Sequence, residues 1–191
     1  MMPTYTGTRA ATYDAQRCQQ HEWWMEHALV DQWAAAQPPG SRVLDAPVGT
    51  GRLLPIYVRH DLACVGVDLS SDMLALAKAR GTAAVLIQQD LLHAELPQAD
   101  CAVCLRFLNW LTAAEALTWL QRICTHVRGD LLLGMWTTPL GSIPVGGAHT
   151  HDARQLHRLL ASCGRSYTRH ELVHTARYQY DGWWVEPYAA A

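Results

Sequence analysis

The stretch RVLDAPVGTGRLLP, from Arg42 to Pro55, decides the fold. An apolar run of strand character ends at an acid, Asp45, passes through a loop with Gly49 and Gly51, and enters a segment of helical character. Loops of this shape between a strand and a helix bind nucleotides. Here a proline, Pro47, stands where the dinucleotide fingerprint has its first glycine. The ligand must therefore tolerate both the proline and the acid.

The chain around this loop alternates between strands and helices. Runs that are apolar throughout predict buried strands, and capping residues such as Ser70, and Thr112 with Glu115, mark helix starts. The expected strands are 42–46, 62–69, 83–90, 100–107 and 130–138; the expected helices are 14–37, 51–60, 70–81, 112–127 and 152–164; and 166–188 has the composition of a hairpin. This order predicts a doubly wound α/β domain, with a parallel sheet covered on both faces and a ligand at the carboxyl ends of its strands.

Three acids decide between cofactors. Asp45, Asp68 and Asp90 fall at the carboxyl ends of the first three expected strands, so they should converge on one crevice. An acid in the turn repels a pyrophosphate, and a proline removes one of the N–H groups that would bind it. S-adenosylmethionine has no phosphate, and its ammonium, sulfonium, ribose diol and adenine amine all suit carboxylates. We therefore expect Asp68 to accept hydrogen bonds from the ribose hydroxyls and Asp90 to accept one from the adenine amine, while Gly49 and Gly51 let the backbone approach the methionine part.

From these residues onward the sequence resembles the class I S-adenosylmethionine-dependent methyltransferases, most strongly from Arg42 to about Leu111. VLDAPVGTGR resembles the family's first motif in a D-x-P-x-G-T-G-R variant, and VGVDLSSDML, QQDLL and CAVCLRFLNWL resemble the motifs of the next three strands, in the expected order. The resemblance implies a Rossmann-like seven-stranded sheet of order 3-2-1-4-5-7-6 with its last strand antiparallel. The cofactor contacts expected from the residues and the resemblance are Tyr13, Arg17, Asp45, Pro47, Gly49, Thr50, Gly51, Asp68, Leu69, Met73, Asp90, Leu91, Leu105 and Arg106.

The resemblance also implies one domain over residues 1–191, with 1–38 as a helical cap over the cofactor and 39–191 as the Rossmann-like core. Tyr13 would then hydrogen-bond the methionine end and Arg17 would pair with its carboxylate. The alternative is that both are surface residues of a solvated helix.

Methyl transfer is an in-line displacement that needs a general base only if the acceptor arrives protonated. The candidates for a base are His149 and His151, and the alternative is that they are ordinary loop or helix-capping histidines. Trp23, Asn109 and Trp110 are the expected acceptor contacts, in a pocket walled by some of the tryptophans 23, 24, 110, 136, 183 and 184. The NPPY-type sequence that the family uses on nucleobase amines is absent, which favours a small-molecule acceptor, as in secondary metabolism. The loop 139–150 would supply further acceptor contacts.

Composition limits the other possibilities. A chain of 191 residues that is 50% hydrophobic predicts one globular domain, and a formal charge of −2 provides no basic surface for nucleic acid. We find no signal peptide or membrane-spanning run, and the CxxC at Cys101 and Cys104 falls in a buried strand, so neither a redox pair nor a metal site is expected. The sequence predicts a cytoplasmic monomer or homodimer.

These observations predict an S-adenosylmethionine-dependent methyltransferase of a small molecule. Two alternatives remain open: a protein of the same fold that uses the cofactor in other chemistry, and a non-catalytic binding or regulatory module.

Overall fold

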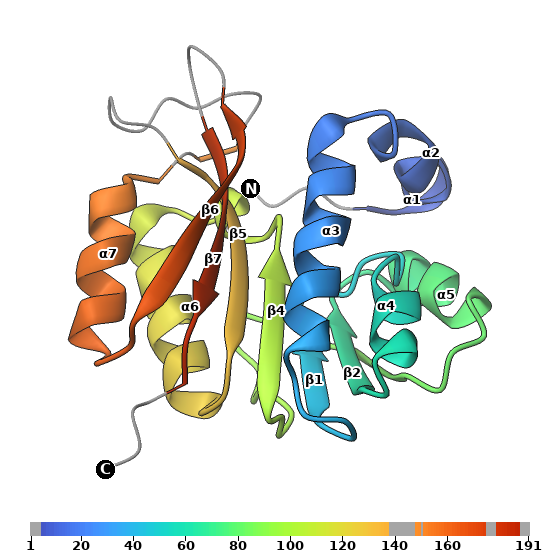
Figure 1. Cartoon of the computed structure of the whole chain (residues 1–191). Coiled ribbons are helices and arrows are strands. Elements are labelled where there is room, and N and C mark those ends of the chain that lie inside the picture. Colours follow the sequence, from blue (N-terminus) through green and yellow to red (C-terminus); the bar gives the residue numbers. More distant parts are fainter. Residues whose placement is uncertain (1–4, 138–147, 150, 175–178, 188–191) are drawn as a thin grey trace.

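The computed structural model describes residues 5–137, 148–149, 151–174 and 179–187, which form one seven-stranded sheet with helices on both faces (Figure 1). The strand order is β3-β2-β1-β4-β5-β7-β6, and β7 runs antiparallel to both of its neighbours, β5 and β6. The strands are β1 Arg42–Asp45, β2 Ala63–Asp68, β3 Val85–Gln88, β4 Cys101–Leu105, β5 Leu131–Thr137, β6 Tyr167–His174 and β7 Gln179–Val185. The predicted doubly wound fold, its strand order and its antiparallel last strand are confirmed.

Two hydrophobic cores lie on the two faces of the sheet. The helices are α1 Gly7–Ala11, α2 Tyr13–Arg17, α3 His21–Ala35, α4 Leu54–Arg59, α5 Ser71–Ala79, the short η1 Leu108–Trp110, α6 Ala113–His126 and α7 Ala153–Ser162. The α3, α4 and α5 helices pack on one face, and α6 and α7 pack on the other (Figure 1). Central β4 belongs to both cores, because its successive side chains point to opposite faces.

The CxxC motif shows this alternation directly. Cys101 joins the core under α3, whereas Cys104 joins the core under α6. Both thiols are buried and free. The two cysteines are therefore core residues on opposite faces of the sheet, and the predicted buried strand is confirmed.

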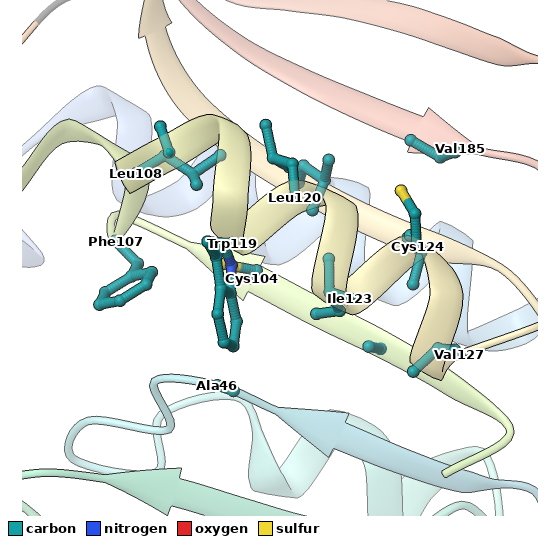
Figure 2. Close-up of a cluster of buried hydrophobic side chains, with 14 of the residues drawn as sticks. Ala46, Cys104, Phe107, Leu108, Trp119, Leu120, Ile123, Cys124, Val127 and Val185 are labelled. Atoms are coloured by element: carbon teal, nitrogen blue, oxygen red, sulfur yellow. The ribbon is translucent and has the colours of Figure 1, made fainter. Parts of the chain in front are cut away.

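The core under α6 is built around Trp119. Its indole packs edge-on against Phe107, with ring centroids 5.3 Å apart, and lies beside Cys104 of β4 (Figure 2). The helix begins at the predicted capping box: the Thr112 hydroxyl accepts from the Glu115 N–H at 3.3 Å, and the Glu115 carboxylate accepts from the Thr112 N–H at 2.8 Å. The cap fixes where α6 begins, and Trp119 fixes which side of α6 faces the sheet.

The N-terminal region differs from the single helix predicted over 14–37. Two helices, α2 and α3, occupy that range, because Gln20 adopts extended backbone angles and the Trp24 indole N–H donates to the Cys18 carbonyl at 2.8 Å. The predicted helix 51–60 also begins later, at Leu54, because Gly49 and Gly51 have positive φ angles of 55° and 69°.

The edge strand β3 is only partly covered, since Val85 is 57% exposed. The connection from β3 to β4 explains this exposure, because residues 89–100, all of them described, form a turn at 91–93 and no helix over the strand. Arg122 of α6 holds this connection by donating to the carbonyls of Leu91 at 2.9 Å and Leu92 at 2.7 Å.

No helix in the described part of the chain is long and apolar enough to cross a membrane.

Candidate functional site

A cavity of about 580 Å³ opens at the carboxyl ends of β1 to β5. This is the position at which doubly wound sheets bind ligands. Its lining includes every expected cofactor contact except Gly51, and also the expected acceptor residues Asn109 and Trp110 and the base candidate His149. The residues brought together are Tyr13, Arg17, Asp45, Pro47, Gly49, Thr50, Asp68, Leu69, Met73, Asp90, Leu91, Leu105, Arg106, Asn109, Trp110 and His149.

The two glycines of the loop have different roles. A side chain added at Gly49 would meet no atom within 4 Å, so this residue leaves the loop open toward the cavity. A Cβ at Gly51 would lie 2.8 Å from the Leu54 side chain and 2.9 Å from Ala77 of α5. Gly51 is absent from the cavity lining because it packs between the loop and these helices. We therefore assign Gly51 a packing role in place of the expected contact with the cofactor.

Asp68 ends β2 and is held rigidly beside the loop. One carboxylate oxygen accepts from the Gly49 N–H at 3.0 Å and the other accepts from the Ser70 N–H at 2.8 Å. Burial raises the pKa of Asp68, and these backbone hydrogen bonds act against that rise. Each oxygen keeps further lone pairs, so an oriented carboxylate faces the cavity with acceptor capacity to spare.

Asp45 ends β1 and is 2% exposed. Its carboxylate accepts from the Tyr57 hydroxyl at 3.2 Å. Burial raises its pKa to about 7, although the nearby Arg52 guanidinium and the Tyr57 hydrogen bond both lower it. Asp45 is thus a cavity acid that exchanges its proton near neutral pH.

Asp90 lies two residues beyond the end of β3. It accepts from the Leu92 N–H and from His93, each at 2.9 Å, and these hydrogen bonds, led by that of His93, lower its pKa. Buried Met73 and Leu91 line the cavity beside it. Apolar side chains next to an exposed carboxylate suit a flat base that carries an amine.

Arginines line the cavity on the side of β4. The buried carboxylate of Glu26, from α3, accepts from Arg106 Nε at 2.9 Å and pairs with Arg52 at 2.5 Å. The Tyr180 hydroxyl of β7 donates to the same carboxylate. Burial would raise the pKa of Glu26, but the two arginines outweigh this effect and lower it. Glu26 therefore remains an anion that joins α3, β4, β7 and the loop.

The charge of the rim changes along the sheet. Asp90, Asp68 and Asp45 follow β3, β2 and β1, whereas Arg106 follows β4. The carboxylates can bind cations and hydroxyls, and the arginines can bind a carboxylate. A pyrophosphate fits poorly here, because the Gly49 N–H is already bonded to Asp68 and α4 begins only after the loop has ended.

The N-terminal segment is docked onto this site. Asp14 of α2 accepts from the Thr50 hydroxyl at 2.7 Å and pairs with Arg80. The Gly7 N–H donates to Asp72 of α5 at 2.6 Å. Tyr13 and Arg17 thereby reach the cavity from α2, as their expected cofactor role requires.

Asn109 organises the side of the cavity near β5. Its amide donates to the His149 carbonyl at 2.9 Å and its oxygen accepts from the Trp136 N–H at 3.1 Å, while the His149 N–H donates to the Asn109 carbonyl at 2.6 Å. Asn109 is 3% exposed. It lines the cavity, but its side chain serves mainly to hold Trp136 and His149 in place.

Two expected site residues lie elsewhere. The Trp23 ring is 5% exposed and is covered by Arg52, whose guanidinium carbon lies 4.5 Å from the ring centroid, so it supports the arginine rather than lining the cavity. The buried His151 places Nε2 2.7 Å from the Leu108 carbonyl and faces a groove between α6 and α7. Of the six tryptophans expected to wall the pocket, Trp110 and Trp136 do so. Most of the loop 139–150 lies outside the described residues.

Sequence reasoning missed Arg52 and Glu26. Arg52 directly follows the glycine loop and is the last residue of the VLDAPVGTGR motif. Glu26 was visible as an acid on the helix face that also carries Trp23, Val30 and Trp33. An acid on an apolar stripe signals a buried ionic partner. Within the described residues, no group of three or more metal-ligating side chains occurs.

Comparisons with known proteins relate part of this chain to methyltransferases. Residues 43–130 match a family model described as a methyltransferase domain. A curated relative from Streptomyces fradiae, dTDP-3-amino-3,6-dideoxy-alpha-D-glucopyranose N,N-dimethyltransferase, is 29% identical over 162 residues. That alignment covers 72% of this chain and 64% of the relative, so the chain spans under two thirds of the relative's length.

Solved structures share the fold. Magnesium protoporphyrin IX methyltransferase from Synechocystis PCC 6803, with bound S-adenosylhomocysteine, superposes with a TM-score of 0.72 at 21% identity, over 87% of this chain and 83% of that one. The [4+2]-cyclase SpnF superposes with a TM-score of 0.70 at 14% identity, over 88% and 82%. The chain therefore has the Rossmann-like fold of the class I methyltransferases, and its residues 43–130 match the methyltransferase-domain family.

Proposed function

We propose that this chain is an S-adenosylmethionine-dependent methyltransferase that acts on a small-molecule acceptor. The observation that carries the proposal is the anchored carboxylate of Asp68 beside an open Gly49, on a rim whose charge changes from acidic to basic. The family match over residues 43–130 supports the same function.

The residues present fit this cofactor group by group. Asp68 would accept from the ribose hydroxyls, and Asp90 beside Met73 and Leu91 would bind the adenine. Asp45 would face the cationic methionine part, and the cavity arginines would bind its carboxylate. Thr50 takes part indirectly, since its hydroxyl is bonded to Asp14.

Bound S-adenosylmethionine supplies a methyl group on a sulfonium, which is already activated toward displacement. The protein then has to align the acceptor with that methyl group and exclude water. Trp110 and Trp136 provide apolar cavity wall for the acceptor, and His149 is the candidate that could remove an acceptor proton. We assign the latter role to His149 alone, because His151 does not line the cavity.

Residues 1–38 would act as a cap over the cofactor and 39–191 as the core. We expect a cytoplasmic monomer or homodimer without a nucleic-acid partner, since the formal charge is −2. The relative's aminosugar substrate makes small amines the first acceptors to test.

Calorimetry with S-adenosylhomocysteine and NAD, together with Asp68→Ala, tests the cofactor. Loss of the ribose hydrogen bonds should weaken S-adenosylhomocysteine binding by about 1–3 kcal/mol. Asp31→Ala, which removes an equally charged residue from an exposed ion pair on α3, is the matched control and should leave the affinity unchanged. NAD binding without S-adenosylhomocysteine binding would contradict the proposal.

A second function is favoured by one observation, the similarity to a [4+2]-cyclase. A protein of this fold could hold the cofactor and catalyse other chemistry. Incubation with methyl-labelled cofactor and a panel of acceptors separates the two, because only methyl transfer labels the product. Acceptor conversion without label would favour the alternative. Cofactor binding without any conversion across the panel would favour a non-catalytic module.

A further inference from the structure

Three arginines from different parts of the chain meet on one side of the cavity: Arg17 of α2, Arg52 directly after the glycine loop and Arg106 directly after β4. They are linked to one another by side chains of the N-terminal region. Gln20 Oε1 accepts from Arg17 at 3.1 Å and from Arg106 at 3.4 Å, and Glu26 binds Arg106 and Arg52.

This cluster carries more positive than negative charge. Guanidinium groups remain charged in proteins. In the part of the chain that the structure describes, Glu26 is the single carboxylate that forms ion pairs with the three arginines, and Arg17 has an amide partner but no acid. The neighbouring acid Asp45 accepts from Tyr57 and is half protonated near pH 7. Two positive charges therefore remain without a full counter-charge in a partly buried site, which is costly unless a ligand supplies anions.

The cluster is also fixed in place before any ligand arrives. Arg106 has a φ of 57°, in the left-handed region that residues with a side chain adopt rarely. Its Nε contacts both oxygens of Glu26 at 2.9 Å, which holds the guanidinium in one orientation at the cavity wall. Such a backbone conformation at a cavity wall points to a function for the side chain that it presents.

The cofactor alone does not neutralise this cluster. The methionine end of S-adenosylmethionine brings a carboxylate, but the same end carries an ammonium and the adjoining sulfonium is also positive. Even with Asp45 fully ionised, the three arginines and the two cofactor cations outnumber the three anions, which are Glu26, Asp45 and the cofactor carboxylate.

We propose that the arginine cluster holds two oxyanions at once: the carboxylate of the cofactor and a carboxylate or phosphate on the methyl acceptor. This inference rests on the proposed function for the first anion. It assigns the acceptor to the class of anionic small molecules and makes Arg17, Arg52 and Arg106 determinants of acceptor specificity.

The test uses protein saturated with S-adenosylhomocysteine. Inorganic phosphate and acetate are titrated in separately at constant ionic strength, and binding is followed by calorimetry and by the fluorescence of the cavity tryptophans. One saturable site is expected for at least one of the two anions, and the better-bound probe identifies the anion type. Arg17→Gln should weaken this site about tenfold or more, as expected for loss of a charge-assisted contact.

Two further variants keep the test sound. Arg106→Lys retains the charge that Glu26 requires but loses the planar fork, so it should fold and still bind the anion more weakly. Arg59→Gln removes the same charge from exposed α4 and should have no effect.

The outcomes separate the two proposals. If phosphate and acetate only compete with S-adenosylhomocysteine and neither binds the saturated protein, the cluster serves the cofactor alone and the inference is overturned. If S-adenosylhomocysteine fails to bind, the proposed function fails. The binding of two oxyanions by the cluster is then tested in the free protein. Binding of two phosphate ions per chain supports this inference, and binding of fewer than two overturns it.

Discussion

Asp45 is the residue whose protonation matters most to the site. Its carboxyl group is buried, accepts one hydrogen bond, and has a pKa raised by burial to about 7 from an ordinary 3.8. The folded protein therefore binds this proton more tightly than the unfolded chain does between those two values. It follows that Asp45 lowers the free energy of unfolding of the ligand-free protein as pH rises from about 4 to about 7.

A cationic cofactor should reverse this penalty. In the proposed site the ammonium and sulfonium would stabilise the carboxylate, so binding would favour loss of the Asp45 proton. We expect the affinity for S-adenosylmethionine to rise about tenfold between pH 6 and pH 8 because of this residue. Calorimetry in buffers of different ionisation enthalpy should detect release of a proton on binding near pH 6.5.

Asp45→Asn is the control for that pH dependence. The amide keeps the shape of the side chain but cannot titrate, so the Asp45 share of the dependence should vanish. Any titration of the cofactor's own amine persists in the variant and is removed by subtraction. Equal pH profiles for the wild-type protein and the variant would show that Asp45 stays outside the binding equilibrium.

At the scale of elements, the start of α6 provides a direct test of a sequence-level prediction. Thr112→Ala removes the hydroxyl that accepts from Glu115 and should lower the free energy of unfolding by about 1 kcal/mol. Urea denaturation measures this loss. Thr118→Ala is the matched control, because its exposed hydroxyl donates to the Ala114 carbonyl within the same helix, and its effect should stay within about 0.5 kcal/mol. Equal losses of stability in the two variants would show that the Thr112 N-cap does not stabilise α6.

The elements that the sequence predicted well are those with local signals. The capping residues Ser70 and Thr112 marked their helices correctly, and the apolar runs of β1, β2, β4 and β5 predicted buried strands. The break at Gln20 depends instead on the contact of Trp24 with Cys18, which no periodicity encodes. The exposure of β3 arises because the β3–β4 connection forms no helix over this strand, and this becomes visible only in the assembled sheet.

At the scale of the whole molecule, the acidic half of the site was more predictable than the basic half. Asp45, Asp68 and Asp90 follow strands of known order, so topology alone brings them together. The arginine cluster needs Glu26 from a helix, Arg52 from a loop and Tyr180 from the last strand. A single sequence does not show that these distant segments meet. Trp23 and His151 were misplaced for the same reason, since burial against a neighbour decided where they lie.

The docking of the N-terminal segment on the core leads to a prediction for the whole molecule. Asp14 joins α2 to Thr50 of the loop and to Arg80 beyond α5. Both members of the Asp14–Arg80 pair are partly exposed, so Asp14→Asn should change the free energy of unfolding by less than about 1 kcal/mol. The Asp14 contacts act only when residues 5–17 are docked on the core. Their loss should therefore make the amide hydrogens of residues 5–17 exchange faster, while exchange in the sheet stays unchanged.

If that segment closes the cofactor site through Tyr13 and Arg17, the weaker docking should also lower the affinity for S-adenosylhomocysteine, by up to about fivefold. Asp31→Asn provides the comparison, because it disrupts an exposed pair between α3 and Arg59 of α4, outside the docked residues 5–17. Its affinity and its exchange over residues 5–17 should match those of the wild-type protein. Faster exchange in Asp14→Asn with undiminished affinity would mean that the segment covers the core without contributing to cofactor binding.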